Sequence, residues 1–522
     1  MDKLKTLFSN KKFLIIIFLI LFSTLFNQYY GNKGVFPHDS FSHFETGYRI
    51  LLGEFPFKDY WVISGPFIDY SQGLFFLIFG VNWQSYVFHA SFFNAVLAIS
   101  TFIILKNFKL NIYYCFLFSI LFSILAYPSS GTPFVDHHSA FFSLLAIYSL
   151  LMGIKYEKKI YWYLLPLLFL CAFLSKQVPS SYVFFSTIFI LFFYSVFNKK
   201  YYWIKYFLLS SLAFLFLLLI IGNTQGINLS SFIKQYILYP QTIGAERLEN
   251  INFTFTGVFS HFKFIYIVLI PIFFVQIRMI LLNINSYKQK DFYYFLTLVL
   301  FTFSLIVHQL ITKNQTFIFF LIPILSAFSI INLKKINFRF NNAVQILIVV
   351  ICVVASIKYH DRYNEGRKFH ELINADFNLV SKAQEIDKKF KGLKWITPEY
   401  KNEPAKEINL INQAKLHLSN DDRKKMLITN YSFFSGILNE KISSPSRWYL
   451  LDGTDFPLKQ NEYFEDYKNL LIDLTKKNSV KVIYIIYPID NSIIYNYFNK
   501  DCLKEVKISK FLSSYELKEG CN

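Results

Sequence analysis

Residues 13–30 read FLIIIFLILFSTLFNQYY, an uncharged run long enough to cross a membrane as one helix. A membrane span needs about 20 predominantly apolar residues. Ten further runs of this kind follow along the chain: 86–105, 111–127, 139–154, 161–175, 181–197, 205–222, 264–283, 292–312, 316–333 and 342–357. The pattern predicts an α-helical polytopic membrane protein with about 11 transmembrane helices.

The basic residues are distributed in a way that predicts an orientation. The chain has 522 residues and a net charge of +19, although only 17% of its residues are charged. Lysine and arginine gather at the N-terminus and in every second short connection, at Lys3, Lys5, Lys11 and Lys12, and then at 106–109, 155–159, 199–205, 288–290 and 334–339. Because positive loops stay inside, these connections are expected in the cytoplasm. Loops 31–85, 128–138 and 223–263 and the tail are then outside.

This charge pattern also limits the partners. The basic residues lie in separate short loops, so topology and attraction to anionic membrane lipids account for them. We therefore expect membrane lipids as partners and no nucleic acid.

Two blocks are predicted, a transmembrane domain at 1–357 and an extracytoplasmic domain at 358–522. The second block opens with an amphipathic helical pattern at 361–391. Apolar β-type runs at 425–429 and 480–487 then alternate with helical patterns near 405–418, 462–476 and 491–499, which favours a small α/β domain with a partly parallel sheet. In an oxidising outer compartment, Cys502 and Cys521 could form a disulfide.

The outer loops next to the membrane carry the candidate chemistry. In the first, Asp39 and His43 are four residues apart, so a short helix would place them on one face, with Glu45 nearby. In the second, Asp136 precedes two histidines. Ionisable residues at the edge of the hydrocarbon are costly and mark candidate sites. A carboxylate in a partly dry site can act as a general base.

These residues are also of types that bind metal. Asp39, His43, Asp136, His137 and His138 could converge on a divalent metal ion. Their spacing matches no specific metal motif, so the sequence leaves a metal open, with His138 as a candidate ligand.

Several cations are expected on the outer side and could stabilise a departing phosphate. They are Lys58, Lys176, Arg247 and Lys313. Arg247 is the preferred candidate because a guanidinium can bind a phosphate through two hydrogen bonds. Each of them could instead be an interfacial cation that extends its charge to water.

One sequence pattern resembles a known family. Asp39 is followed by a predicted helix, then by Leu51-Leu-Gly-Glu-Phe-Pro-Phe-Lys-Asp-Tyr60, then by Gly65-Pro66 and Phe79-Gly80. This order resembles the first outer loop of bacterial GT-C-fold glycosyltransferases, the group related to protein O-mannosyltransferases and aminoarabinose transferases. The resemblance covers roughly the first 180 residues and includes Phe173-Leu-Ser-Lys-Gln177.

The resemblance implies a GT-C-like enzyme of the bacterial inner (plasma) membrane. It would transfer a hexosyl or pentosyl group from a polyprenyl-phosphate sugar donor to a lipid, glycan or protein acceptor on the outer face. Asp39 would be the base and Asp136 the second acid. Substrate contacts would come from His43, Glu45, Lys58, Lys176, Gln177 and Arg247.

The chain departs from the family pattern at one position that matters. The family often has Asp-Glu in the first loop, whereas Asp39 is followed by Ser40. A paired-acid site would therefore need Glu45 or Asp136 as its second member.

Two other functional classes are compatible with this sequence. A transporter or flippase for a lipid-linked sugar would need charged or broken helices near the middle of the membrane. A polysaccharide polymerase or ligase would place its essential residues in loop 223–263, Arg247 among them.

Overall fold

The computed structural model describes residues 11–249, 253–313, 317–336, 340–367 and 371–518. The chain forms two compact units. The helical unit contains Met1–Gly31, Val87–Leu217 and Asn250–Phe369, and the mixed unit contains Asn32–Tyr86, Leu218–Glu249 and His370–Asn522. The units therefore do not follow a single cut near residue 358, because parts of two predicted outer loops belong to the same unit as the tail.

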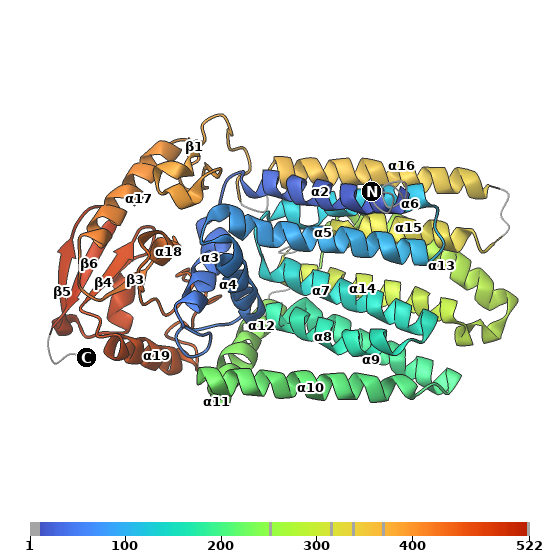
Figure 1. Cartoon of the computed structure of the whole chain (residues 1–522), viewed down its shortest axis with the longest axis horizontal. Helices are drawn as coiled ribbons and strands as arrows, with labels where there is room; N and C mark the ends of the chain where they lie inside the picture. Colours follow the sequence, from blue (N-terminus) through green and yellow to red (C-terminus); the bar gives the residue numbers. More distant parts are fainter. Residues whose placement is uncertain (1–10, 250–252, 314–316, 337–339, 368–370, 519–522) are drawn as a thin grey trace, which may run out of the picture. The chain divides into compact units, whose positions relative to one another are not determined.

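Among the described residues, nine helices are long and apolar enough to cross a membrane. They are α2 (Lys11–Gly31), α5 (Trp83–Asn107), α6 (Ile112–Leu125, continued by a 3-10 turn to Ser129), α7 (Val135–Tyr156), α9 (Gln177–Asn198), α10 (Tyr202–Gln225), α13 (Lys263–Leu282), α14 (Lys290–Thr312) and α16 (Asn341–His360, continued to Glu365). Two shorter apolar helices are α8 (Lys159–Ser175) and α15 (Leu321–Leu333). Each predicted span thus corresponds to a helix (Figure 1), which confirms a multi-pass helical membrane protein.

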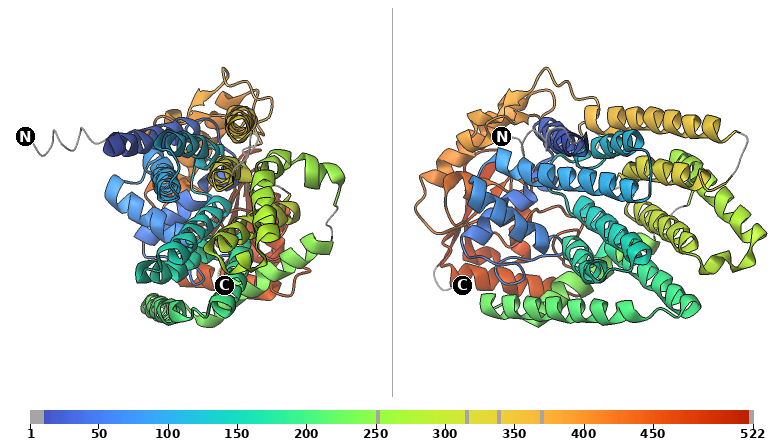
Figure 2. Two further views of the ribbon diagram at one scale, coloured as in Figure 1. Left: turned by 90° about the vertical axis from the view of Figure 1, so that its right-hand side faces the viewer. Right: turned by 45° about the vertical axis from the view of Figure 1, so that its right-hand side comes forward.

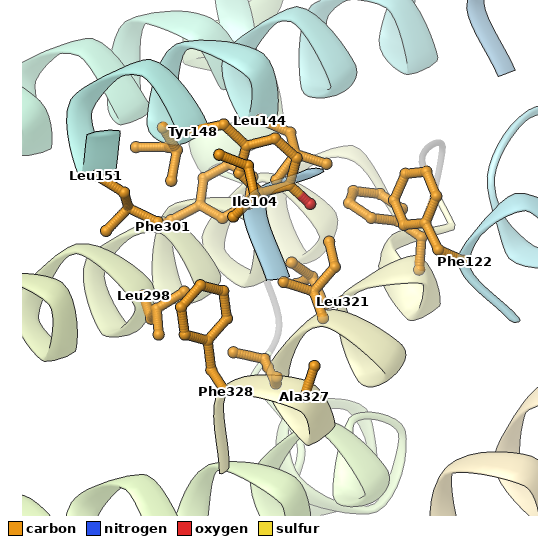
Figure 3. Close-up of a cluster of buried hydrophobic side chains, with 14 of the residues drawn as sticks. Ile104, Phe122, Leu144, Tyr148, Leu151, Leu298, Phe301, Leu321, Ala327 and Phe328 are labelled. Carbon is orange, nitrogen blue, oxygen red and sulfur yellow. The ribbon is translucent and has the colours of Figure 1, made fainter. Parts of the chain in front are cut away.

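Helix α7 lies at the centre of the helical unit. In its most apolar stretch 83% of the residues are buried, against 6% in α10. α7 packs against α8, α9 and α14, and α15 packs against α6, α13 and α16. Figure 2 shows these helices from two further directions. Large apolar side chains fill the space between them (Figure 3), among them Phe122, Leu144, Leu151, Leu298, Phe301 and Phe328.

The basic connections gather at one end of the helical unit. Lys155 donates to the carbonyl of Asn107 at 2.5 Å. Glu157 forms ion pairs with Lys200 at 2.5 Å and with Lys290 at 2.8 Å. These contacts join connections that the positive-inside pattern assigns to one side of the membrane.

The opposite helix ends also contact one another. Tyr30 at the end of α2 hydrogen-bonds to the imidazole of His360 at the end of α16. Asn364 donates to the carbonyl of Ile124 at 3.0 Å, and Arg367 donates to that of Pro128 at 3.1 Å. Alternate ends of the predicted spans thus meet, as an alternating topology requires.

A four-stranded sheet lies in the mixed unit, with the order β3-β4-β6-β5. The strands are β3 (Lys425–Ile428), β4 (Val482–Ile486), β5 (Leu503–Lys507) and β6 (Leu512–Leu517). β3 and β4 are parallel, with Lys425 opposite Val482, and the other pairs are antiparallel. The predicted small, partly parallel sheet is therefore confirmed. A further pair, β1 (Ser381–Lys382) and β2 (Lys394–Trp395), is antiparallel.

The mixed unit also contains helices from all three of its segments. They are α3 (Pro37–Leu51), α4 (Pro66–Phe79), α11 (Leu229–Phe232), α12 (Tyr239–Glu249), α17 (Pro404–Ser419), α18 (Phe434–Leu438) and α19 (Phe464–Lys477). One apolar core joins Trp61 and Tyr239 to residues of β3, β4 and α19. The loop segments and the tail therefore share a hydrophobic core, which makes them one folding unit.

Two helical patterns predicted for the tail are only partly present. At 361–391, Asp361–Glu365 continue α16 as a π-helix, but the described residues after them form turns, β1 and two short 3-10 helices, Ala383–Glu385 and Lys388–Phe390. Glu371 and Asn374 have positive φ angles, and the Asp376 side chain accepts the backbone N–H of Asn378, so local turns replace the helix. The helical pattern near 491–499 is a 3-10 helix over Asn491–Asn496.

Strands β5 and β6 were missed. Four of the five residues of β5 are exposed, as expected of an edge strand without an alternating apolar pattern. Cys502, just before β5, is disulfide-bonded. Cys521 lies outside the described residues, so the pairing of these two cysteines stays a prediction.

The stability of the helical unit depends on a close backbone approach at Gly131. Its φ is +72°, and an added Cβ would lie 2.5 Å from the Cα of Gly31. We expect Gly131→Ala to lower the free energy of unfolding by about 1–3 kcal/mol, because the substitution combines a strained backbone with a backbone overlap. Thermal unfolding of the purified protein in detergent would measure this loss.

Gly222 on α10 provides the matched control, since an added Cβ there meets no atom within 4 Å. Gly222→Ala should leave stability unchanged or raise it by up to about 1 kcal/mol. Equal effects of the two substitutions would contradict the assigned role of Gly131.

Candidate functional site

Helix α3 positions the predicted base in the mixed unit. Pro37 occupies the first turn, where its missing N–H costs nothing, and Asp39 follows in the same turn. A carboxylate is favourable there because the helix N-terminus is positive. Asp39 is half-buried. The predicted short helix with Asp39 and His43 on one face is therefore present.

A buried acid holds His43 in place. The Nδ1 of His43 lies 2.7 Å from Oδ1 of Asp69 on α4. The same carboxylate accepts hydrogen bonds from Thr46 at 2.5 Å and from the Tyr60 hydroxyl at 3.0 Å. Burial lowers the pKa of His43, although Asp69 opposes the shift. His43 is thus a neutral, oriented imidazole at neutral pH.

Glu45 lies in a different environment from Asp39. It is six positions further along α3, so the two side chains leave the helix on different sides. Glu45 is buried and accepts a hydrogen bond from Ser435 of α18. Burial raises the pKa of Glu45 to about 7.

Two predicted cations lie near the surface of the mixed unit. Lys58 donates to the carbonyl of Gln225 at 2.8 Å and lines a groove of about 420 Å³ together with Lys234 and Asp466. Arg247, in the last turn of α12, is partly exposed.

The second predicted acid lies in a charged cluster of the helical unit. Asp136, in the first turn of α7, forms an ion pair with Lys176 at 2.7 Å, and the His308 Nε2 lies 3.0 Å from its other carboxylate oxygen. Asp136 and His308 are each 1% exposed. Lys176 separates α8 from α9, and Gln177 begins α9. Residues of α7, of α14 and of the junction between α8 and α9 thus form one cluster.

His138 points away from Asp136. The two residues are two positions apart on α7, about 200° around the helix. The Nδ1 of His138 lies 3.1 Å from the Tyr127 hydroxyl, and its Nε2 lies 3.2 Å from the Nε2 of His89.

Two of the candidate metal ligands on α7 are already engaged with protein groups. Both oxygens of Asp136 and both ring nitrogens of His138 already have protein partners. Within the described parts of the chain, no three His, Cys, Asp or Glu residues converge in a way that could hold a metal ion.

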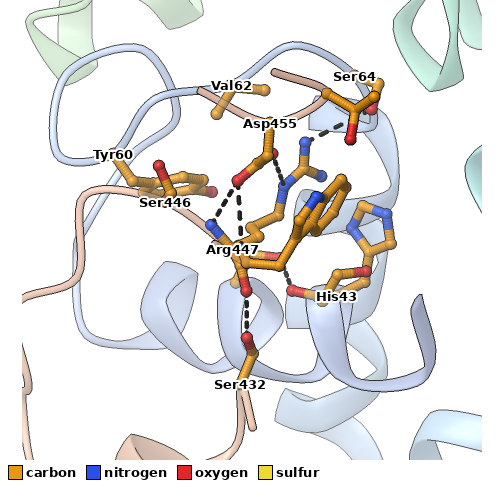
Figure 4. Close-up of polar contacts among 12 residues, drawn as sticks. His43, Tyr60, Val62, Ser64, Ser432, Ser446, Arg447 and Asp455 are labelled. Carbon is orange, nitrogen blue, oxygen red and sulfur yellow. Dashed lines mark hydrogen bonds and ion pairs between the residues drawn. The ribbon is translucent and has the colours of Figure 1, made fainter. Parts of the chain in front are cut away.

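The mixed unit contains a buried charged pair that the sequence analysis missed. Arg447 lies beside Asp455, with Nε 3.7 Å from Oδ1, and both are at most 2% exposed. Figure 4 shows this pair with Ser64 and His43. Burial raises the pKa of Asp455 to about 6, although Arg447 opposes the shift. The only sequence signal was an arginine next to a tryptophan, in a loop far from α3 along the chain.

Comparison with known proteins gives a structural likeness only. No family model and no curated protein matches the sequence. Among solved structures 18 chains match. One is an oligosaccharyltransferase of Archaeoglobus fulgidus, crystallised as a complex with Zn and sulfate, which is 12% identical to this chain. The match covers 90% of this chain and 68% of that one, with a TM-score of 0.44.

The buried ion pair of the helical unit can be tested by a double-mutant cycle. We expect Asp136→Asn to lower the free energy of unfolding by about 3–5 kcal/mol, because it leaves Lys176 without its counter-ion in an apolar setting. Combining it with Lys176→Gln should cost less than the sum of the two single changes. Unfolding of the four proteins in detergent would measure the coupling.

A more exposed pair of the same unit serves as the control. Lys335 and Asp291 are 2.8 Å apart and about one third exposed. Asp291→Asn should change stability by about 0–1 kcal/mol. Strict additivity of the Asp136 and Lys176 effects would show that the cluster is not coupled.

Glu45 gives a pH-dependent prediction. The folded protein raises the pKa of Glu45 from 4.5 to about 7, so it binds a proton that the unfolded chain releases. This contribution to stability is complete below pH 4.5 and is lost as the pH rises through 7. The slope is at most about 1.4 kcal/mol per pH unit.

Glu45→Gln should therefore reduce the loss of stability between pH 5 and pH 8. Asp455 also titrates in this range, so the informative quantity is the difference between variant and parent. Ser435→Ala, which keeps the carboxyl group, should retain the slope. Parallel pH profiles of the parent and Glu45→Gln would contradict the raised pKa.

Proposed function

We propose that this protein is a glycosyltransferase that moves a sugar from a polyprenyl phosphate to an acceptor hydroxyl at the outer face of the bacterial inner membrane. The observation that carries the proposal is the placement of Asp39. This half-buried acid lies on a short helix outside the nine membrane-length helices, with an oriented neutral imidazole one turn away.

The reaction requires a base and a stabilised leaving group. The acceptor oxygen attacks the anomeric carbon and forms a new C–O bond. The bond between that carbon and the phosphate oxygen breaks, and its electron pair stays on the phosphate. The acceptor proton goes to the Asp39 carboxylate, and such proton transfer contributes about 10²–10⁴-fold to a rate. A single displacement of this kind inverts the anomeric centre.

The charged cluster of the helical unit has a proposed role in donor binding. Lys176 carries its ammonium group at a junction of two helices, and Asp136 holds that group in place. Charged residues buried between apolar helices are rare and costly, which favours a functional role. Lys176 would contact the donor phosphate, with Asp136 as its positioning residue.

The remaining predicted contacts belong to the same proposal. His43 and Glu45 on α3, Lys58 in the groove, Gln177 at the start of α9 and Arg247 on α12 would bind donor or acceptor. The contacts among the basic connections support a cytoplasmic N-terminus and an outer mixed unit.

The test is transfer of radiolabelled sugar from polyprenyl-phosphate donors by the protein in membranes. We expect Asp39→Asn to reduce transfer at least about 100-fold with unchanged expression, since the amide cannot accept the proton. Asp501→Asn, which changes an exposed acid before β5, is the matched control and should keep full activity.

Two results would overturn the proposal in different ways. Full activity of Asp39→Asn would remove the assigned base and direct attention to loop 223–263. Absence of transfer from the unaltered protein, when the donors are shown to be present, would favour a transporter of the lipid-linked sugar.

A further inference from the structure

The loop that carries Arg447 is fixed from several sides. The Arg447 backbone N–H donates to Asp455 Oδ2 at 2.8 Å, and the Trp448 N–H reaches the same oxygen at 3.3 Å. The carbonyl of Arg447 accepts a hydrogen bond from the Ser432 hydroxyl (Figure 4). Tyr449 donates its N–H to Asn430 at 2.8 Å. The backbone of the loop is therefore held by contacts that do not involve the Arg447 side chain.

The guanidinium of Arg447 has few hydrogen bonds. Its Nη2 reaches the Ser64 hydroxyl only at 3.5 Å, and the Asp455 carboxylate is 3.7 Å from Nε. Nε and Nη1 form no hydrogen bond with the described residues. Arg447 is nevertheless only 2% exposed. A buried donor without an acceptor costs about 1–3 kcal/mol, and more when it is charged.

Arg447 lies close to α3, the helix that carries Asp39. Its guanidinium is beside Ser64, and Figure 4 shows it together with His43 of α3. The neighbouring indole of Trp448 lies 6.5 Å from the imidazole of His38, the residue before Asp39. Asp39 and Arg447 thus border the same region of the mixed unit.

We propose that Arg447 binds the phosphate of the lipid-linked sugar beside Asp39. This inference rests on the proposed function and assigns a phosphate contact that the sequence had placed on Arg247. Nη1, which has no hydrogen bond with the described residues, and Nη2, whose contact with Ser64 is long, form one edge of the guanidinium. Such an edge can grip two phosphate oxygens at once. It would stabilise the negative charge that remains on the phosphate when the glycosidic bond breaks.

Asp455 acts as a positioning residue in this arrangement. Its carboxylate accepts backbone N–H groups of the Arg447 loop and lies beside Nε. At 3.7 Å from Nε it does not form a hydrogen bond with the guanidinium. The Trp448 ring, 5.4 Å from the Arg447 Cζ, covers another side of the group. An anion at this position would therefore meet donors that are already oriented.

The test is equilibrium binding of the purified full-length protein to a short-chain polyprenyl phosphate and to the matching polyprenol. We expect the protein to prefer the phosphate at least about tenfold, because a hydrogen bond to a charged group is worth that much in affinity. Arg447→Gln should abolish the preference. Arg447→Lys should reduce it, since lysine cannot supply the guanidinium fork. Arg423→Gln, at an exposed arginine of the mixed unit that has no role in the proposed site, should leave it unchanged.

Removal of a buried arginine can prevent folding, so a second variant is included. Arg447→Met combined with Asp455→Asn removes both charges together and avoids an isolated buried carboxylate. This double variant should fold and should bind phosphate and alcohol forms equally. Thermal unfolding would establish that each variant is folded.

The possible results distinguish a failure of the role proposed for Arg447 from a failure of the proposed glycosyltransferase function. A protein that does not distinguish phosphate from alcohol overturns both. A preference that survives in Arg447→Lys and in the double variant overturns only the role of Arg447. Displacement of the probe by phosphatidylglycerol at equal concentration would assign the site to an ordinary lipid headgroup and would also overturn the inference.

Discussion

The free energy of taking charge out of water determines where ionisable groups lie in this protein. A charge near the centre of a bilayer costs several kcal/mol, so apolar helices carry their charged residues near their ends. At one end, lysines meet backbone carbonyls and a few carboxylates, as in the pair of Glu157 with Lys290. Asp136 also lies at a helix end, but it is almost fully buried there, and Lys176 and His308 compensate its charge. The same cost applies to Arg447 and Asp455 in the mixed unit.

The sequence was sufficient to predict the helical architecture. Long uncharged runs have few structural solutions in a membrane, since every backbone group must be satisfied within the helix. The two helices that fall short, α8 and α15, were predicted with the same signal but are too brief to meet the length of a full span. In the tail, α17, α19 and the parallel pair β3 and β4 followed apolar patterns. Most of the segment 361–391 did not form the predicted helix, because Asx turns and β pairing outweighed a weak helical periodicity.

The candidate site was only partly accessible from sequence. Asp39, His43, Asp136 and Lys176 were identified because they stand out next to apolar runs or match a familiar loop. Asp69 was missed as the partner of His43, because it lies on α4, 26 residues further along the chain. No local sequence pattern marks Arg447 as a candidate site residue. Its relation to α3 arises from tertiary packing between segments that are hundreds of residues apart, and such contacts leave no periodic signal in a single sequence.

The mixed unit is built from three separate segments, and this has a consequence for how the protein is made. Ser64 and Arg447 are 383 residues apart. The ribosome must therefore complete helices α5 to α16 before the partner of Ser64 exists. Until then α3, with Asp39, is without the core that Trp61 shares with α19 and the sheet. A chain interrupted during synthesis would hold its apolar helices and an unfinished mixed unit. The order of translation thus delays assembly of the mixed unit until the tail has been made.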